Sequence, residues 1–209
     1  MTPEDVQAHF TRSDGTYRFA RWGRPIAPVV FGVEPETLPI VKGAFEAVAV
    51  LANHQMAETD PELGINVMMF FFRDWRELTD TPNLDRLIPD LGPLVDRLIA
   101  AEANQYRIFR FDDGGAIKAC FIFIGMDEHM SQVPAETLAL SQVVQSILMW
   151  SDTAFTQTSP LAVVPETGTT ILRPEIAGLI RAAYDPVLPV AADDPSHALR
   201  IYARMGPVQ

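Results

Sequence analysis

Histidine and acidic side chains are the residues of this chain whose chemistry suits metal binding or proton transfer. The histidines are His9, His54, His129 and His197. None lies four residues from another, the spacing that places two imidazoles on one face of a helix. We expect His54 and His197 near helix ends or on polar faces. His129 follows Asp127 and Glu128 in a polar loop, so a hydrolase with an unrecognised site near Glu128 and His129 is an alternative function.

Familiar catalytic motifs are absent. The chain contains no GxGxxG, GxxxxGK[ST], GxSxG or HExxH. Residues 112–115 (Asp-Asp-Gly-Gly) begin like a calcium loop but lack its later acidic ligands, so we predict a hairpin turn there. The single cysteine, Cys120, excludes an internal disulfide and lies in an apolar segment, where we expect a small buried residue. We predict no catalytic residue, no metal site and no cofactor.

Three neutral polar residues, Ser141, Gln142 and Gln145, lie on a helix predicted over residues 134–150. Residues four apart in a helix lie one turn apart on one face, which relates Ser141 to Gln145. A hydroxyl and an amide are poor zinc ligands, and Gln142 has no group that titrates. One interpretation is that these residues form only the polar stripe of an amphipathic helix.

The place of this helix, after a sheet and a hairpin, resembles that of the zincin metalloproteases. In zincins the helix carries HExxH, with two histidine ligands one turn apart and a glutamate that polarises water. The resemblance places Ser141 and Gln145 at the ligand positions and Gln142 at the general-base position. The spacing is kept, whereas the chemistry of a hydrolytic zinc centre is missing.

The wider pattern is similar to a bacterial family of uncharacterised, predicted secreted or lipid-anchored proteins with a degenerate zincin-like domain. That family carries a Glu-Glu-x-x-Gln type motif, then an Asp, then a Leu-Tyr-Asp-Pro-x-Leu segment. The counterparts here are Gln145, Asp152 and residues 183–188, which include Tyr184. Ser141 and Gln142 stand where acidic residues are usual. The resemblance spans roughly residues 18–205.

The resemblance implies a non-catalytic binding or assembly module, a pseudoenzyme. Its candidate cleft is lined by Ser141, Gln142, Gln145, Asp152 and Tyr184. Such a cleft suits an extended peptide or protein partner, because an edge strand can pair main chain to main chain without a metal. A further alternative is a subunit of a larger complex, in which the aromatic and proline residues of 150–172 cover a partner.

The elements that must position these residues follow from apolar periodicity. We predict strands over residues 25–33, 65–73, 106–112 and 116–125, and helices over 36–58, 93–103, 134–150, 174–184 and 195–205. Residues 65–73, which include the Phe70–Phe72 run, are apolar on both faces and belong in the centre of a covered sheet. Residues 1–24 read as a polar lead-in with a turn at Asp14–Gly15, and residues 151–172 read as a long loop.

These elements define the expected fold class. A helical crossover joins the first two strands, which makes them parallel, and the hairpin adds an antiparallel strand. The sequence therefore predicts a single α+β domain over residues 1–209, in which helices cover a mixed sheet of about four strands. The zincin-like character of this fold is implied by the resemblance.

Composition limits the classes of partner. The chain has 209 residues, of which 48% are hydrophobic and 21% charged, values typical of a folded domain. A net charge of −11 argues against nucleic acid as a partner, since cationic surface supplies most of that affinity. We predict no membrane insertion. The first residues show no signal peptide, so we expect a cytoplasmic location as the sequence stands, and a periplasmic or envelope location if a leader was removed.

Overall fold

A mixed sheet of four strands lies at the centre of the chain. The computed structural model describes residues 1–206. The strands β2 (Pro28–Phe31), β3 (Val67–Phe72), β4 (Gln105–Phe111) and β5 (Ile117–Gly125) are ordered β2-β3-β5-β4. β2 and β5 run parallel to β3, and β4 runs antiparallel to β5. The predicted parallel pair and antiparallel hairpin are both confirmed.

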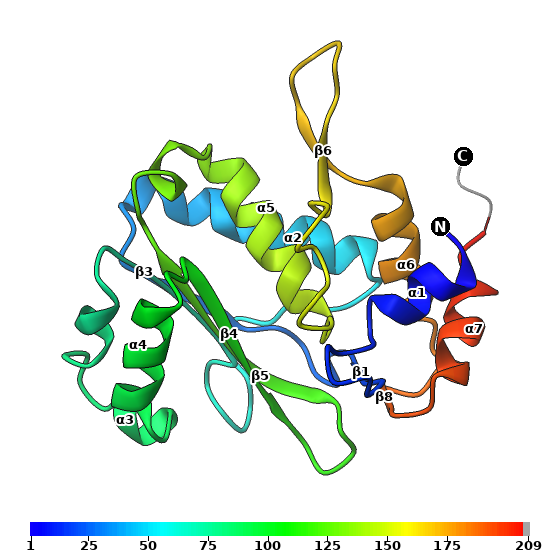
Figure 1. Cartoon of the computed structure of the whole chain (residues 1–209), viewed down its shortest axis with the longest axis horizontal. Coiled ribbons are helices and arrows are strands. Elements are labelled where there is room, and N and C mark those ends of the chain that lie inside the picture. Colours follow the sequence, from blue (N-terminus) through cyan, green and yellow to red (C-terminus); the bar gives the residue numbers. More distant parts are fainter. Residues whose placement is uncertain (207–209) are drawn as a thin grey trace.

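Helices cover the two faces of this sheet (Figure 1). The helices α2 (Leu38–Leu51) and α5 (Ala135–Ile147) pack together on one face. The 3-10 helix η2 (Trp75–Leu78) and the helices α3 (Leu84–Leu87) and α4 (Leu91–Ala100) lie on the other. The chain is thus a mixed α+β protein, and residues 75–90, which had no predicted element, supply part of the second layer.

Strand β3 explains why both faces are covered. Successive side chains of a strand point to opposite faces. Val67 and Met69 belong to the larger hydrophobic cluster beneath α2 and α5, whereas Phe70 and Phe72 belong to the smaller cluster beneath α3 and α4. The predicted central position of this strand is confirmed, and Cys120 of the neighbouring strand is buried as predicted.

Helix α2 buries the face that its periodicity predicts. Val41, Phe45 and Val48 lie three or four residues apart, and all are buried. The helix is shorter than the predicted 36–58, because residues 35–37 form the 3-10 helix η1 (Pro35–Thr37) and Asn53 takes a left-handed φ of 49°. That conformation ends a helix because it turns the chain away from the helical path.

The first 24 residues are not a polar lead-in, and that prediction is wrong. They form the helix α1 (Pro3–Ala8) and the short strand β1 (Phe19–Ala20), which pairs with β8 (Ala191–Ala192). Their apolar side chains are buried against distant parts of the chain: Val6, Phe10, Tyr17, Phe19 and Trp22. The predicted turn at Asp14–Gly15 is present, with Gly15 at a φ of 84°.

The region predicted as a long loop contains an antiparallel hairpin. Its strands are β6 (Leu161–Val163) and β7 (Thr170–Leu172), and the hairpin projects from the body of the molecule beside α5 (Figure 1). The helices α6 (Pro174–Ala183) and α7 (Ser196–Tyr202) follow close to their predicted positions. The short 3-10 helix η3 (Met130–Gln132) leads from β5 into α5.

His197 lies in the first turn of α7, near a helix end as predicted, but it is buried in the core, with 3% of its surface exposed. The Tyr17 hydroxyl lies 3.1 Å from its Nδ1, and the Phe19 ring centroid lies 4.3 Å from its own. Its Nε2 is enclosed and has no hydrogen-bond partner within residues 1–206. Burial, with Arg200 and Arg21 nearby, lowers the pKa of His197 to about 4.

We predict that His197 makes the fold sensitive to mild acid. The unfolded chain binds a proton at His197 near pH 6.5, whereas the folded chain binds it only near pH 4. The free energy of unfolding therefore has its full value with respect to His197 above pH 6.5. It decreases as the pH falls from 6.5 toward 4, by no more than about 1.4 kcal/mol per pH unit.

Urea unfolding at several pH values between 7 and 4 measures this loss. His197→Gln should flatten the dependence on pH relative to the original chain, whatever it does to stability at pH 7. His129→Gln, at an exposed loop position, is the matched control and should leave the slope unchanged. Equal slopes in all three chains would refute the assignment.

Candidate functional site

Helix α5 carries the three neutral polar residues singled out in the sequence. Gln145 Nε2 donates to Ser141 Oγ over 3.0 Å, so these residues pair along the helix surface, where both are half-buried. Gln142 differs, because only 1% of its surface is exposed and its side chain points at the sheet. The predicted polar stripe therefore describes Ser141 and Gln145, while Gln142 takes part in a buried polar contact.

That contact joins α5 to the edge strand β4. Arg107 Nη2 donates to Gln142 Oε1 and, over 3.1 Å, to Gln105 Oε1. Gln142 Nε2 donates to the same Gln105 oxygen over 3.0 Å. We call Gln105, Arg107 and Gln142 the guanidinium–amide cluster. Sequence reasoning missed two of its members, although polar residues two apart on the face of a strand that packs against a helix were a usable signal.

Arg107 has no acidic partner. Within residues 1–206 no carboxylate lies within ion-pair distance of it, and its buried Nε has no acceptor. Burial lowers the pKa of Arg107 to about 10, which leaves the guanidinium charged at neutral pH. A buried charge normally requires an opposite charge or a full set of hydrogen bonds. Here two neutral amide oxygens accept from one of its three nitrogens.

A groove of about 560 Å³ opens between α5, the β6–β7 hairpin and the start of β4. We call it the hairpin groove. Its polar lining comes from the first half of α5, the residues at and beside the hairpin, the start of β4 and the loop before η3: Gln105, His129, Thr137, Ser141, Gln142, Ser159, Thr170 and Arg173. No aspartate or glutamate lines it, although Glu175 lies 3.9 Å from the guanidinium of Arg173.

The outer edge of β4 is free of strand partners within residues 1–206. The Gly125 amide donates to Asn104 O over 2.8 Å, which fixes the phase of the ladder with β5. In an antiparallel pair, alternate residues face the partner strand, so Gln105, Arg107 and Phe109 direct their main-chain groups outward. One of these outward groups, Phe109 O, accepts a long hydrogen bond of 3.5 Å from Arg110 Nη1.

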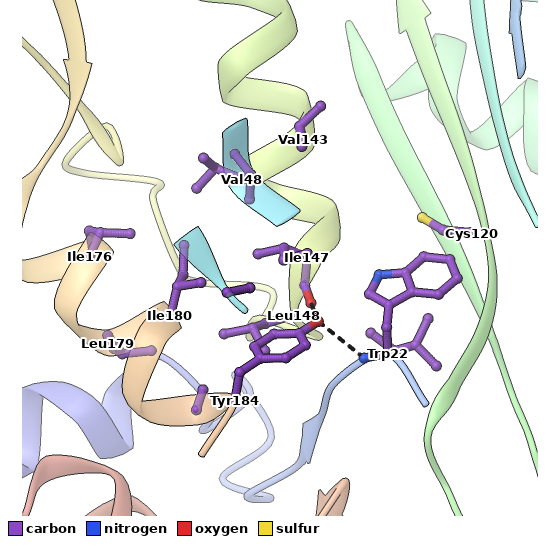
Figure 2. Packing of buried hydrophobic residues seen from close by; sticks show 14 of the residues in the cluster. Trp22, Val48, Cys120, Val143, Ile147, Leu148, Ile176, Leu179, Ile180 and Tyr184 are labelled. Carbon is purple, nitrogen blue, oxygen red and sulfur yellow. Dashed lines mark hydrogen bonds between the residues drawn. The ribbon is translucent and has the colours of Figure 1, made fainter. Parts of the chain in front are cut away.

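Tyr184 lies in the core and does not reach the hairpin groove. Its hydroxyl donates to Ile147 O over 2.8 Å and accepts from the Trp22 amide over 3.3 Å. Figure 2 shows the ring between the end of α5 and the N-terminal segment, close to Leu148. Burial raises the pKa of this phenol. Tyr184 therefore joins three distant segments and also lines a separate cavity of about 1040 Å³ between α2 and α6.

Asp152 also lies apart from the groove. One carboxylate oxygen accepts from the Ser13 amide over 2.8 Å, and the other accepts from the Ser13 hydroxyl. It thus holds the turn of the N-terminal segment. The five residues of the predicted cleft do not line one surface, because Ser141 and Gln142 line the hairpin groove, Gln145 lies beside Ser141, and Asp152 and Tyr184 bind the first 24 residues.

The acidic loop before η3 is held by a local contact. Asp127 Oδ1 accepts from the Met130 amide over 2.7 Å, while Glu128 and His129 are exposed. Among residues 1–206, no three His, Cys, Asp or Glu side chains are grouped so that they could hold a metal ion. Asp112 accepts from the Gly114 and Ala116 amides, as the predicted hairpin turn requires.

Comparison with known proteins returned no family model, no curated protein and no solved structure that matches the chain. In the described part of the chain, no helix combines the length and the apolar character needed to span a bilayer. The geometry of α5, β4 and the hairpin groove is therefore the basis for inferring function.

We predict that Tyr184 is a structural anchor. Tyr184→Phe leaves the Trp22 amide and the Ile147 carbonyl without their buried partner, which should lower the free energy of unfolding by about 1–3 kcal/mol. Urea denaturation measures the change. Tyr202→Phe is the matched control, since Tyr202 is 41% exposed and should change stability by less than about 0.5 kcal/mol. Equal effects of the two substitutions would contradict the anchor role.

Proposed function

We propose that the chain is a non-catalytic binding module on a degenerate zincin-like scaffold, and that it binds an extended polypeptide along the outer edge of β4. The observation that carries this proposal is the free edge of β4 beside the hairpin groove. The bound segment would add a fifth strand, pairing its main chain with Gln105, Arg107 and Phe109. Specificity would come from side chains that enter the groove.

Three observations support this function. Main-chain pairing needs neither a metal nor a titratable residue, which suits a helix whose polar residues are Ser141, Gln142 and Gln145. Gln105 belongs both to the β4 edge and to the groove, so one ligand could contact both. The order of mixed sheet, hairpin and then α5 also agrees with the zincin-like description.

The alternative functions receive less support. Asp127 accepts from the Met130 amide, and within residues 1–206 no hydrogen bond joins Glu128 or His129 to another side chain as a hydrolytic pair would require. A partner surface built on Trp150 is disfavoured, because that ring stacks on Phe10 with centroids 5.6 Å apart and its Nε1 donates to Val144 O over 2.9 Å.

The test is a selection followed by an N-methyl scan. A random library of displayed heptapeptides is selected on the purified protein, and recovered sequences are resynthesised with one N-methyl amide at each position in turn. Strand addition predicts a period of two. Methylation of amides that face β4 should weaken binding at least about threefold, because each removes a main-chain hydrogen bond, and methylation between them should have little effect.

Hydrogen exchange of the protein supplies an internal control. The amides of Gln105, Arg107 and Phe109 should gain protection when peptide binds, whereas those of Tyr106 and Ile108 are already paired with β5 and should change little. Failure to recover any binding peptide, or binding with no alternation in either measurement, would refute the proposed function.

A further inference from the structure

We infer that Arg107 is a specificity residue that receives a carboxylate from the bound polypeptide. This inference rests on the proposed function and adds the chemistry of the ligand to it. The carboxylate belongs to an acidic side chain of that polypeptide, and the test below distinguishes it from the terminal carboxylate. The guanidinium would thereby gain the anion that residues 1–206 do not provide.

Arg107 has an incomplete set of hydrogen bonds. Nη2 donates to the two glutamine oxygens of the guanidinium–amide cluster. Nε is enclosed without an acceptor, and Nη1 has no acceptor within residues 1–206 but is not enclosed. Nη1 is thus a charged donor that a ligand can reach. A charge-assisted hydrogen bond at such a site is about twice as strong as a neutral one.

The position of Arg107 on β4 favours contact with an added strand. Arg107 is the middle of the three residues whose main-chain groups point away from β5. A residue of an added strand that lies opposite Arg107 directs its side chain to the same face of the sheet, with the two Cβ atoms about 5 Å apart. That face is the one on which Gln142 of α5 meets Arg107. A carboxylate on this residue would therefore lie over the guanidinium.

The electrostatic surroundings of Arg107 also favour an anion. No acidic side chain lines the hairpin groove, and the one charged residue of its lining, Arg173, lies 3.9 Å from Glu175. Gln105 is exposed, so its amide is free to move away when an anion displaces it from Arg107. The low local polarity that makes the lone guanidinium costly also strengthens its attraction to a carboxylate. The site thus favours an anion over its neutral amide analogue.

The experiment compares ligands that differ by one charge. Three synthetic heptapeptide libraries are built from uncharged residues and are acetylated. The first has a central Glu and an amidated terminus, the second has a central Gln and an amidated terminus, and the third has only a free terminal carboxylate. Bound peptides are quantified by mass spectrometry. The Glu library should bind about tenfold more tightly than the Gln library. A preference for the third library alone would assign the anion to the terminus and overturn the side-chain assignment.

Substitutions assign the preference to Arg107. Arg107→Met should bring the ratio of charged to neutral ligand close to one. It should change the free energy of unfolding only modestly, because removing a buried charge without an ionic partner offsets the hydrogen bond that the buried Gln142 Oε1 loses. Arg110→Met is the matched control on the same strand, since Arg110 belongs to the opposite face, 6.0 Å from the Phe121 ring, and should leave the ratio unchanged.

The two proposals fail in different ways. Peptides that bind along β4 with equal affinity for Glu and Gln would overturn the role of Arg107 and leave the proposed function standing. A charge preference that survives in Arg107→Met would also overturn it. Absence of any peptide binding, from all three libraries and the displayed library, would remove the proposed function itself. A large loss of stability in Arg107→Met with an unchanged preference would show that Arg107 is only structural.

Discussion

A strand that is apolar on both faces must be covered on both faces, and this constraint shapes the whole molecule. β3 and β5 lie inside the sheet, with alternate side chains in two separate hydrophobic clusters. Burial of apolar surface on this scale is the dominant stabilising contribution, so a helical layer forms on each side. Once both faces are closed, the main chain of the sheet remains accessible only at its edges. The edges are β2 and β4, and β4 is the longer of the two, which makes it the edge where we propose that a ligand pairs.

Tyr184 and Arg107 are two enclosed polar side chains with contrasting hydrogen bonds. The Tyr184 hydroxyl donates and accepts within the chain, so its hydrogen bonds contribute to stability. Arg107 is different, because its charge faces amide oxygens and two of its nitrogens lack acceptors within residues 1–206. A charge without an opposite charge in such surroundings opposes folding, which the hydrogen bond to Gln142 only partly offsets. This incomplete set of hydrogen bonds at an open edge is the feature for which we propose a ligand.

The sequence predicted the elements that depend on neighbours along the chain. The 3.6-residue period of α2 and the apolar run of β3 are local signals, as is the Asp112–Gly115 turn, and all three are present where they were predicted, although α2 is shorter than predicted. The first 24 residues were misread because their buried side chains are irregularly spaced and each packs on a distant segment, as Phe10 does on Trp150. The five residues of the predicted cleft do not lie together for the same reason. The spacing of Ser141 and Gln142 placed both residues on α5, but no local pattern shows that Tyr184 faces the core.

The guanidinium–amide cluster shows what the motif on α5 did not predict. The sequence suggested that Gln142 replaces a general base and has no role of its own. In the structure its amide accepts from Arg107 and donates to Gln105, two residues that lie 35 and 37 positions away in sequence. A carboxylate at position 142 would pair with Arg107 and cancel the charge that a ligand would otherwise meet. The neutrality of Gln142 therefore leaves the Arg107 charge uncancelled within the contact, and the anion preference that we propose for this edge depends on that residue.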